Sequence, residues 1–198
     1  MSSENPIPLP ENYIPAHLKS EVESVLIGQW QIAHRVEEMA ATIMEDFRDK
    51  DLVIVSLLNG TILFLADLIR QIDLPMHLDF MGVSSYGSGT EARELAYTKE
   101  LRLDVEGRDV LLVDDILDTG QTLHQVTLKL LKLNPSSIKT CVLLDKAARR
   151  VHEIEADYVG FEVPDEFVVG YGLDFAERYR NLPFIGVLKP KVYESREA

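Results

Sequence analysis

Three acidic residues follow a strongly apolar run in the stretch VLLVDDILDTGQTL, which spans residues 110–123. They are Asp114, Asp115 and Asp118, and Thr-Gly-Gln-Thr follows directly as residues 119–122. Two adjacent carboxylates can accept hydrogen bonds from the cis-diol of a ribose, or bind a Mg²⁺ ion. A third carboxylate nearby can act as a general base. The spacing therefore indicates a site that holds a sugar or a metal beside a proton acceptor.

The residues after the acids have the composition of an anion-binding turn. Gly120 lets the backbone turn and approach a ligand, and the helix that follows leaves unpaired N–H groups at its amino end. With the helix dipole and the hydroxyls of Thr119 and Thr122, these groups suit a phosphate monoester. The GxxxxGK[ST] pattern is absent from this stretch. Capping of the helix by Asp118 or Thr119 is the simpler alternative, but it explains only one acid.

Apolar runs and apolar periodicity predict the elements that position these residues. Helices are expected over residues 29–48, 62–72 and 122–133. Strand candidates are residues 52–58, 76–83, 110–113, 137–144, 157–163, 167–171 and 184–188. This order favours an α/β fold with a mostly parallel sheet, in which ligands bind at the carboxyl ends of the strands. Polar breaks fall at three such ends: Asn59-Gly60, residues 114–122, and Asp145-Lys146.

Residues 84–98 form a polar, glycine-containing segment, SSYGSGTEARELAYT, that is too long for a tight turn. Two interpretations stay open. The segment is either a mobile functional loop or a hairpin with weak arms. A closing loop would exclude water from a reactive intermediate.

Bulk properties limit the class of protein. A length of 198 residues suits one domain, or one domain with a small lobe, and 46% hydrophobic residues suffice for a sizeable core. A net charge of −13 disfavours binding to nucleic acid. No apolar run is long enough for a membrane span, and the proline-rich first fifteen residues do not resemble a signal peptide, so a cytoplasmic protein is expected. The lone Cys141 is expected to be a buried hydrophobe.

The stretch VLLVDDILDTGQTL resembles the phosphoribosyl pyrophosphate (PRPP) signature of type I phosphoribosyltransferases, an apolar run followed by two acids, two apolar residues and D-[ST]-G-x-T. Further stretches resemble successive segments of hypoxanthine-guanine phosphoribosyltransferases: LLNGTILFLADLIR, LDFMGVSSYGSGT, LLDKAARR and PDEFVVGYGLDFAERYRNLPFIGVL. The resemblance implies the type I phosphoribosyltransferase fold, a mostly parallel central sheet flanked by helices, with a small hood formed by N- and C-terminal segments. It implies one domain over residues 1–198, with an extended arm at 1–15, a core at about 30–163 and a base-binding hood segment at about 164–190.

The resemblance also implies a reaction. A purine-salvage transferase of this kind moves the 5-phosphoribosyl group from PRPP to N9 of hypoxanthine or guanine, giving IMP or GMP and pyrophosphate. It implies Mg²⁺ as cofactor and assembly as a homodimer or homotetramer, with no nucleic-acid or membrane partner. Two alternatives stay open: a non-catalytic regulator that senses PRPP or a nucleotide, and a xanthine-preferring phosphoribosyltransferase.

Carried onto this sequence, the signature implies a role for each of its polar residues. Asp118 matches the general base, which acts at N7 of the purine. Asp114 and Asp115 match acids that bind the ribose hydroxyls and the metal. The 5′-phosphate would bind to Asp118, Thr119, Gly120, Gln121 and Thr122.

The remaining implied residues lie outside the signature. Leu58, Asn59 and Gly60 match a pyrophosphate-binding loop that often contains a cis peptide between its first two residues, and Arg180 matches an arginine that contacts pyrophosphate. The purine-binding set is Lys146, Phe167, Val168 and Asp174, in which Lys146 donates to O6, Phe167 stacks on the base, and Asp174 is also associated with the metal. Ser85 and Tyr86 open the lid loop.

The sequence departs from the family pattern at several of these places. Many relatives carry Lys where this chain has Asn59, so the loop lacks a positive charge. Asp114 stands where relatives often have Glu, and Gln121 where they often have Lys. The lid reads GSGTEARE rather than a shorter run. These differences bear on the choice among hypoxanthine, guanine and xanthine, and leave the reaction class unchanged.

Overall fold

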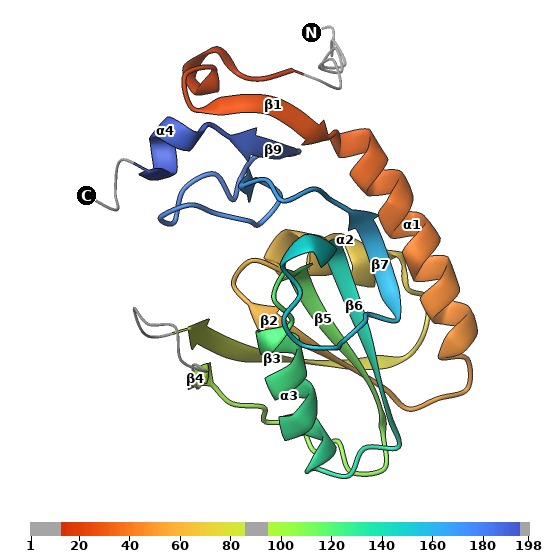
Figure 1. Cartoon of the computed structure of the whole chain (residues 1–198). Helices are drawn as coiled ribbons and strands as arrows, with labels where there is room; N and C mark the ends of the chain where they lie inside the picture. The colour runs from red at the N-terminus through yellow and green to blue at the C-terminus, as the bar shows by residue number, and fades with distance from the viewer. Residues whose placement is uncertain (1–12, 86–94, 195–198) are drawn as a thin grey trace, which may run out of the picture.

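The computed structural model describes residues 13–85 and 95–194, so Tyr86 lies outside the described residues. Two sheets make up the fold. A six-stranded sheet has the order β4-β3-β2-β5-β6-β7, and a three-stranded sheet has the order β1-β9-β8. Figure 1 shows the small sheet above the upper end of the large one, with α1 and α2 on one side and α3 on the other. The predicted mixed α/β fold with a mostly parallel sheet and a hood is confirmed.

The elements have the following bounds. The strands are β1 Val22–Ile27, β2 Leu52–Leu58, β3 Met76–Ser85, β4 Leu95–Lys99, β5 Asp109–Leu117, β6 Ser137–Asp145, β7 Tyr158–Glu162, β8 Val168–Val169 and β9 Ile185–Leu188. The helices are α1 Gln29–Asp46, α2 Ile62–Gln71, α3 Gln121–Leu131 and α4 Pro190–Tyr193, with 3₁₀ turns η1 Ala16–Leu18 and η2 Ala147–Arg149. Among these described elements, no helix combines the length and apolar character that crossing a bilayer requires.

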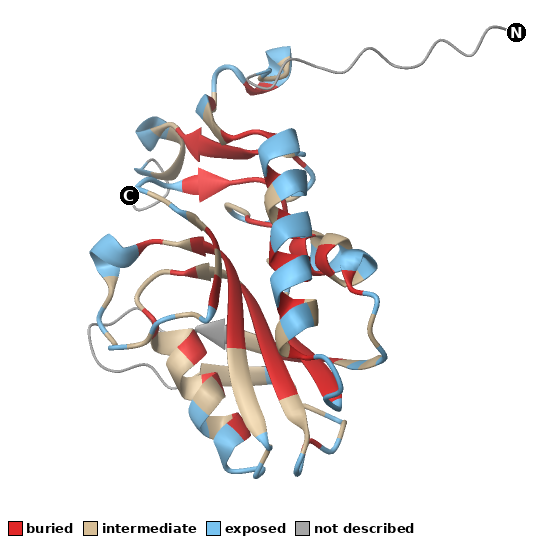
Figure 2. Ribbon diagram, turned by 90° about the vertical axis from the view of Figure 1, so that its right-hand side faces the viewer, coloured by how far each residue is buried: buried red, intermediate tan, exposed pale blue. Residues whose placement is uncertain are grey.

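The large sheet is buried on both faces because its central strands are apolar at successive positions. In β2, Leu52 and Ile54 pack toward α1 and α2, whereas Val53 and Val55 pack toward α3. This two-residue alternation is the normal geometry of a strand, and here both faces are covered by helices. Figure 2 shows the resulting buried centre of the sheet. The rigid sheet fixes where its strands end.

Strand register brings the predicted polar breaks to one edge of the large sheet. β2 and β5 pair in parallel from Leu52 and Asp109 onward, and β5 and β6 pair in parallel up to Leu117 and Asp145. The segments that follow β2, β5 and β6 therefore leave the sheet at the same end. The hood covers this end (Figure 1).

The hood contains a strand that the sequence patterns did not predict. β1 pairs antiparallel with β9, from Val22 opposite Leu188 to Ile27 opposite Ile185. Its burial does not alternate, and the register shifts twice along the pairing. A two-residue period is therefore absent from VESVLI, which explains why the strand was missed.

The polar segment after β3 includes the second arm of a hairpin. β4 pairs antiparallel with β3, with Ser85 opposite Leu95 and Gly82 opposite Lys99. The hairpin interpretation is thus confirmed for these described residues. At its base, the buried Asp79 carboxylate accepts hydrogen bonds from the Lys99 ammonium and from the backbone N–H of residues 102 and 103.

Candidate active site

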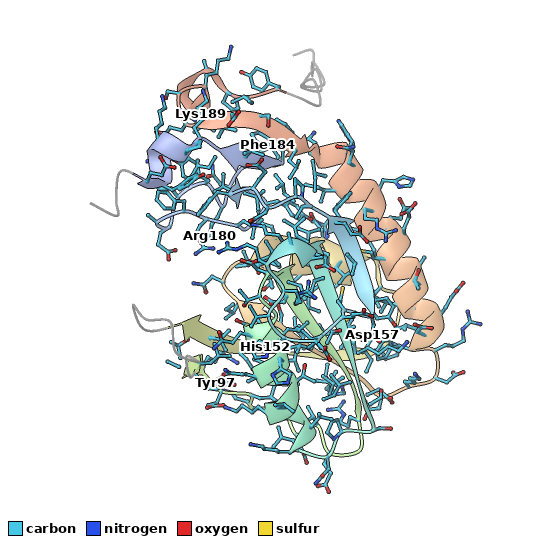
Figure 3. All side chains as sticks on the ribbon, in the orientation of Figure 1. Tyr97, His152, Asp157, Arg180, Phe184 and Lys189 are labelled. Carbon is cyan, nitrogen blue, oxygen red and sulfur yellow. The ribbon has the colours of Figure 1, made fainter. Side chains whose placement is uncertain are left out.

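A cavity of about 540 Å³ lies between the carboxyl ends of the large sheet and the hood. It is lined by residues 57–60 at the end of β2 and just beyond it, by residues 114–123 from the end of β5 into the start of α3, and by Val83, Leu95, Asp174 and Arg180. Figure 3 shows Arg180 on the side of the hood that faces the large sheet. The cavity therefore brings together the acid cluster, the glycine turn and the pyrophosphate-loop candidates that are far apart in the sequence.

The turn before α3 has the conformation of an anion cradle. Gly120 has φ +84°, in the left-handed region that favours glycine, and α3 begins at Gln121. The Thr119 hydroxyl accepts a hydrogen bond from the N–H of Gln121 at 3.4 Å. Gly120 is buried, and a Cβ atom at this position would lie 2.8 Å from Ile154 Cγ2, so the turn packs closely on the segment behind it. The amino end of α3 thereby faces the cavity.

The adjacent acids Asp114 and Asp115 lie at the bottom of the cavity. Asp114 is 8% exposed, and its Oδ1 accepts a hydrogen bond of 3.0 Å from the N–H of Asp115. Burial raises the pKa of the Asp114 carboxyl well above its ordinary value, and the charge of Asp115 raises it further. Burial also raises the pKa of Asp115, against hydrogen bonds from Asp114 and the N–H of Ile116 that lower it. A bound cation, or hydroxyl groups that donate hydrogen bonds, would lower the free-energy cost of ionising these two buried carboxyls.

The Asp118 carboxylate has one oxygen free to accept a proton. Among the described residues, Asp118 Oδ1 is buried and has no hydrogen-bond partner. Its other oxygen, Oδ2, lies 3.5 Å from Arg149 Nη1. Buried acceptors are normally satisfied, so this oxygen marks a place where a ligand donor fits. Sequence reasoning missed Arg149, whose only signal was the pair of arginines shortly after Lys146.

The loop after β2 is packed between the acid cluster and the hood. The peptide bond between Leu58 and Asn59 is cis, as the family resemblance implies. A Cβ atom on Gly60 would overlap the carboxylate of Asp115, and a Cβ atom on Gly172 would overlap the carbonyl of Gly60. The loop therefore packs so closely on both neighbours that neither Gly60 nor Gly172 has room for a side chain.

Arg180 and Asp174 form the hood side of the cavity. Arg180 Nη2 lies 3.0 Å from Asp174 Oδ1, and Nη1 donates to the carbonyl of Gly172 at 2.8 Å. A second carboxylate, that of Glu177, lies 3.0 Å from the same Nη2. The guanidinium is thus held by two carboxylates and by the carbonyl of Gly172, a residue that packs against the carbonyl of Gly60 in the loop of residues 58–60.

Comparison with known proteins decides the family. Residues 27–176 match the family model described as phosphoribosyl transferase domain. Hypoxanthine-guanine phosphoribosyltransferases from Bacillus subtilis and Staphylococcus epidermidis are 49% and 48% identical, over 90% and 89% of this chain and 99% of each relative. The crystal structure of a hypoxanthine phosphoribosyltransferase from Staphylococcus aureus superimposes with a TM-score of 0.86 at 44% identity, covering 91% of this chain and 99% of that one.

The chain belongs to the hypoxanthine-guanine phosphoribosyltransferase family.

The purine-binding candidates of this phosphoribosyltransferase lie beside the cavity and do not line it, except for Asp174. Lys146 is 5% exposed, and its Nζ donates to the carbonyl of Glu166 at 2.7 Å. This hydrogen bond ties the lysine to the residue directly before Phe167. Phe167 is 37% exposed, and Val168 is buried in β8. The structure therefore groups Lys146 with Phe167 and Val168 at the junction of β6 and the hood.

The residues present fit a Mg²⁺ ion that shares its coordination shell with a substrate. No group of three or more potential ligands surrounds a common point within the described part of the chain. Mg²⁺ commonly uses one or two protein carboxylates and completes its shell with water and substrate phosphates. The adjacent Asp114 and Asp115, whose pKa values are raised by burial, supply such a partial set, and Asp174 lines the same cavity.

Of the two lid candidates, only Ser85 lies within the described residues. The backbone of Ser85 ends β3 and pairs with Leu95, which lines the cavity. Tyr86 lies outside the described residues. The lid assignment therefore stays a prediction.

Proposed function

We propose that this phosphoribosyltransferase catalyses purine salvage, transferring the 5-phosphoribosyl group of PRPP to N9 of hypoxanthine or guanine. The C1′–N9 bond forms, the C1′–oxygen bond to pyrophosphate breaks, and a proton leaves N7 of the base. The products are IMP or GMP and pyrophosphate. The observation that carries this proposal is the single cavity that joins the phosphate turn, the acid pair and the Arg180 side of the hood.

The proposed roles follow from chemical type and position. N–H groups at the amino end of α3, with Thr119, Gln121 and Thr122, hold the 5′-phosphate. Asp114 and Asp115 accept hydrogen bonds from the ribose hydroxyls. Asp118 accepts the N7 proton, which is supported by its buried oxygen without a partner in the described residues.

The leaving pyrophosphate is proposed to bind beside the acid pair, where the loop of residues 58–60 lies against Asp115. The backbone of residues 58–60 and the Arg180 guanidinium supply hydrogen-bond donors and positive charge. Mg²⁺ would be held by Asp114 and Asp115 with Asp174 nearby, and when bound it supplies charge that stabilises pyrophosphate. Asn59 carries no charge. In this proposal, Arg180 therefore supplies most of the protein's positive charge at the pyrophosphate site.

The purine is proposed to bind between the cavity and the hood. Lys146 donates to O6, Phe167 stacks on the ring, and the backbone of Val168 contacts the edge of the base. A lysine donor at this position prefers an oxo group, because the 6-amino group of adenine would present a second donor. This selects hypoxanthine, guanine or xanthine over adenine, and the crystal-structure relatives include an enzyme named for hypoxanthine, guanine and xanthine together.

The remaining expectations belong to the same proposal. Residues 1–198 would act as one functional domain, in the cytoplasm, as a homodimer or homotetramer without nucleic-acid or membrane partners. Light scattering of the purified protein tests the assembly, and cell fractionation tests the location.

The deciding experiment measures turnover of the purified protein with PRPP, Mg²⁺ and each of hypoxanthine, guanine, xanthine and adenine. We expect turnover of hypoxanthine and guanine and none of adenine. Turnover of xanthine above the other two bases would favour the xanthine-preferring alternative. No turnover of any base, with PRPP binding intact, would instead favour a non-catalytic regulator. The 45–49% identity of relatives named as transferases does not favour the regulator.

A further inference from the structure

The back of the phosphate turn is held by one arginine. The Arg150 guanidinium donates from Nε to the carbonyl of Asp118 at 3.0 Å and from Nη2 to the carbonyl of Leu117 at 3.3 Å. Nη1 donates to the carbonyl of Ile154 at 2.5 Å, and Nη2 also contacts the Asp145 carboxylate. The Arg150 side chain is only 17% exposed. All three guanidinium nitrogens of Arg150 thus donate hydrogen bonds to the turn or to the segments next to it.

These contacts answer a requirement of the turn itself. If the N–H groups of the turn are to face a phosphate, the carbonyls of the same residues point away from it and need hydrogen-bond donors elsewhere. The carbonyl of Leu117 accepts from the Lys146 N–H at 2.9 Å, and that of Thr119 accepts from the N–H groups of residues 151 and 152 at 2.9 and 3.1 Å. The carbonyl of Asp118, between these two, accepts from Arg150.

The segment of residues 146–152 therefore forms a support behind the cradle. A Cβ atom on Gly120 would lie 3.1 Å from Arg150 Cδ, so the arginine also packs directly against the glycine of the turn. Figure 3 shows His152, from the same segment, beside the ribbon of α3. The Asp145 carboxylate at the end of β6 anchors the guanidinium to the large sheet.

We propose that Arg150 is a positioning residue, which orients the 117–120 backbone so that its N–H groups bind the 5′-phosphate of the substrate and product. The inference rests on the proposed function for the identity of the ligand. Arg150 acts through the turn and does not contact the ligand. Arginine suits this role because its planar guanidinium offers five donors in fixed directions from three nitrogens, whereas the three donors of a lysine all come from one nitrogen.

The test compares three variants of the full chain: Arg150→Gln, Arg150→Lys and Arg108→Gln. Arg108 is a matched control, because its side chain is 18% exposed and pairs with Asp51 through two hydrogen bonds of 2.7 Å, away from the cavity. Calorimetry measures the Kd for GMP, steady-state kinetics measures KM for PRPP and for hypoxanthine, and thermal unfolding measures Tm.

We expect Arg150→Gln to raise the Kd for GMP and the KM for PRPP about tenfold or more, as for loss of a charged hydrogen-bond donor. The KM for hypoxanthine should change less than about threefold, because the Lys146 ammonium is held separately by the carbonyl of Glu166. The Kd for GMP and the KM for PRPP of Arg150→Lys should lie between those of the wild type and those of the glutamine variant. Arg108→Gln should lower Tm and leave all three ligand constants near their wild-type values.

Equal losses of GMP affinity in the Arg150 and Arg108 variants would overturn the proposal, as would unchanged GMP affinity in Arg150→Gln. If Arg150→Gln does not fold, the lysine variant carries the same comparison. If the wild type turns over no base but binds GMP, the proposed function fails, and the calorimetric comparison still decides the role of Arg150. A wild type that binds no GMP would overturn both.

Discussion

The ring of Tyr193 lies almost parallel to the ring of Phe167, with centroids 4.8 Å apart and 17° between the planes. Phe175 meets Phe167 edge to face, with centroids 5.5 Å apart. Phe167 is still 37% exposed, so neither neighbour covers the whole ring. The short helix α4 near the C-terminus of the chain thus fixes the orientation of the aromatic residue that the family resemblance places on the purine.

Tyr193→Ala is expected to raise KM for guanine about threefold to tenfold, since stacked aromatic pairs contribute about 0.5–1.5 kcal/mol. Tyr193→Phe keeps the ring and should stay near the wild-type value. Steady-state kinetics with either substrate varied checks this, and KM for PRPP should change little. Val192→Ala, in the same helix, is the control for general loosening of the hood. An equal rise in KM for guanine in that variant would contradict the stacking role.

Asp118→Asn is expected to lower kcat about 100-fold or more, because an amide cannot accept the N7 proton. The side-chain volume is nearly unchanged, so circular dichroism and Tm should match the wild type. Single-turnover rates with hypoxanthine measure the effect on chemistry directly. Near-normal rates would remove Asp118 from the role of base.

Asp114→Asn is expected to stabilise the protein while impairing catalysis. Burial raises the pKa of Asp114, so the ionised carboxylate destabilises the folded state. For an acid with a raised folded pKa, stability is greatest below the unfolded pKa and falls as pH rises toward the folded value. A neutral amide should therefore raise the free energy of unfolding at pH 8.

The stabilisation by Asp114→Asn should be smaller at pH 4 than at pH 8, because the raised pKa of the buried wild-type carboxyl favours its protonated form as pH falls. Denaturant unfolding at the two pH values measures it. Because the same residue is proposed to bind ribose and metal, kcat/KM for PRPP should fall in parallel. A variant that is less stable than the wild type at pH 8 would contradict the prediction.

Gly172→Ala is expected to weaken pyrophosphate binding and to lower stability. Gly172 has φ +101°, and a Cβ atom there would overlap the carbonyl of Gly60. The substitution must displace the loop of residues 58–60, so KM for pyrophosphate in the reverse reaction should rise about tenfold. Gly107→Ala is the matched control, since Gly107 also has positive φ, +68°, but no atom within 4 Å of the added Cβ. Both variants should lose about 1 kcal/mol of stability from the backbone, and only the first should lose pyrophosphate binding.

Asp79→Asn is expected to destabilise the base of the β3–β4 hairpin by about 3 kcal/mol at pH 7. Burial alone would raise the pKa of Asp79, but the Lys99 ammonium and three backbone N–H groups outweigh it and hold the pKa well below its ordinary value. An acid with a depressed folded pKa contributes stability above the unfolded pKa and loses it as pH falls toward the folded value.

The difference in the free energy of unfolding between wild type and Asp79→Asn should therefore be largest at pH 7. It should shrink below about pH 4, near the pKa of an unfolded aspartate. Urea unfolding across this range measures the effect. Asp73→Asn, at an exposed position, is the control and should change stability little. A pH-independent difference would mean that the charge of Asp79 is not what stabilises the hairpin.

The sequence by itself determined the chemistry of the signature and the class of fold. An apolar strand, a glycine with positive φ and the amino end of α3 lie within a dozen residues, and their conformations depend on near neighbours along the chain. Continuous apolar runs likewise identified the central buried strands, and the 3.6-residue period identified the three long helices. Such local preferences can be recognised in the sequence without knowing the tertiary contacts of the residues.

Only the tertiary structure decided which distant residues meet. Strand register brings the loop of residues 58–60 against Asp115, and the hood brings Gly172 and Arg180 to the same loop. Arg150 behind the phosphate turn and the strand β1 in the hood left no periodic signal, because their partners are separated from them by many residues. Contacts of this kind arise from the pairing of strands and the packing of the hood, which no short stretch of sequence contains.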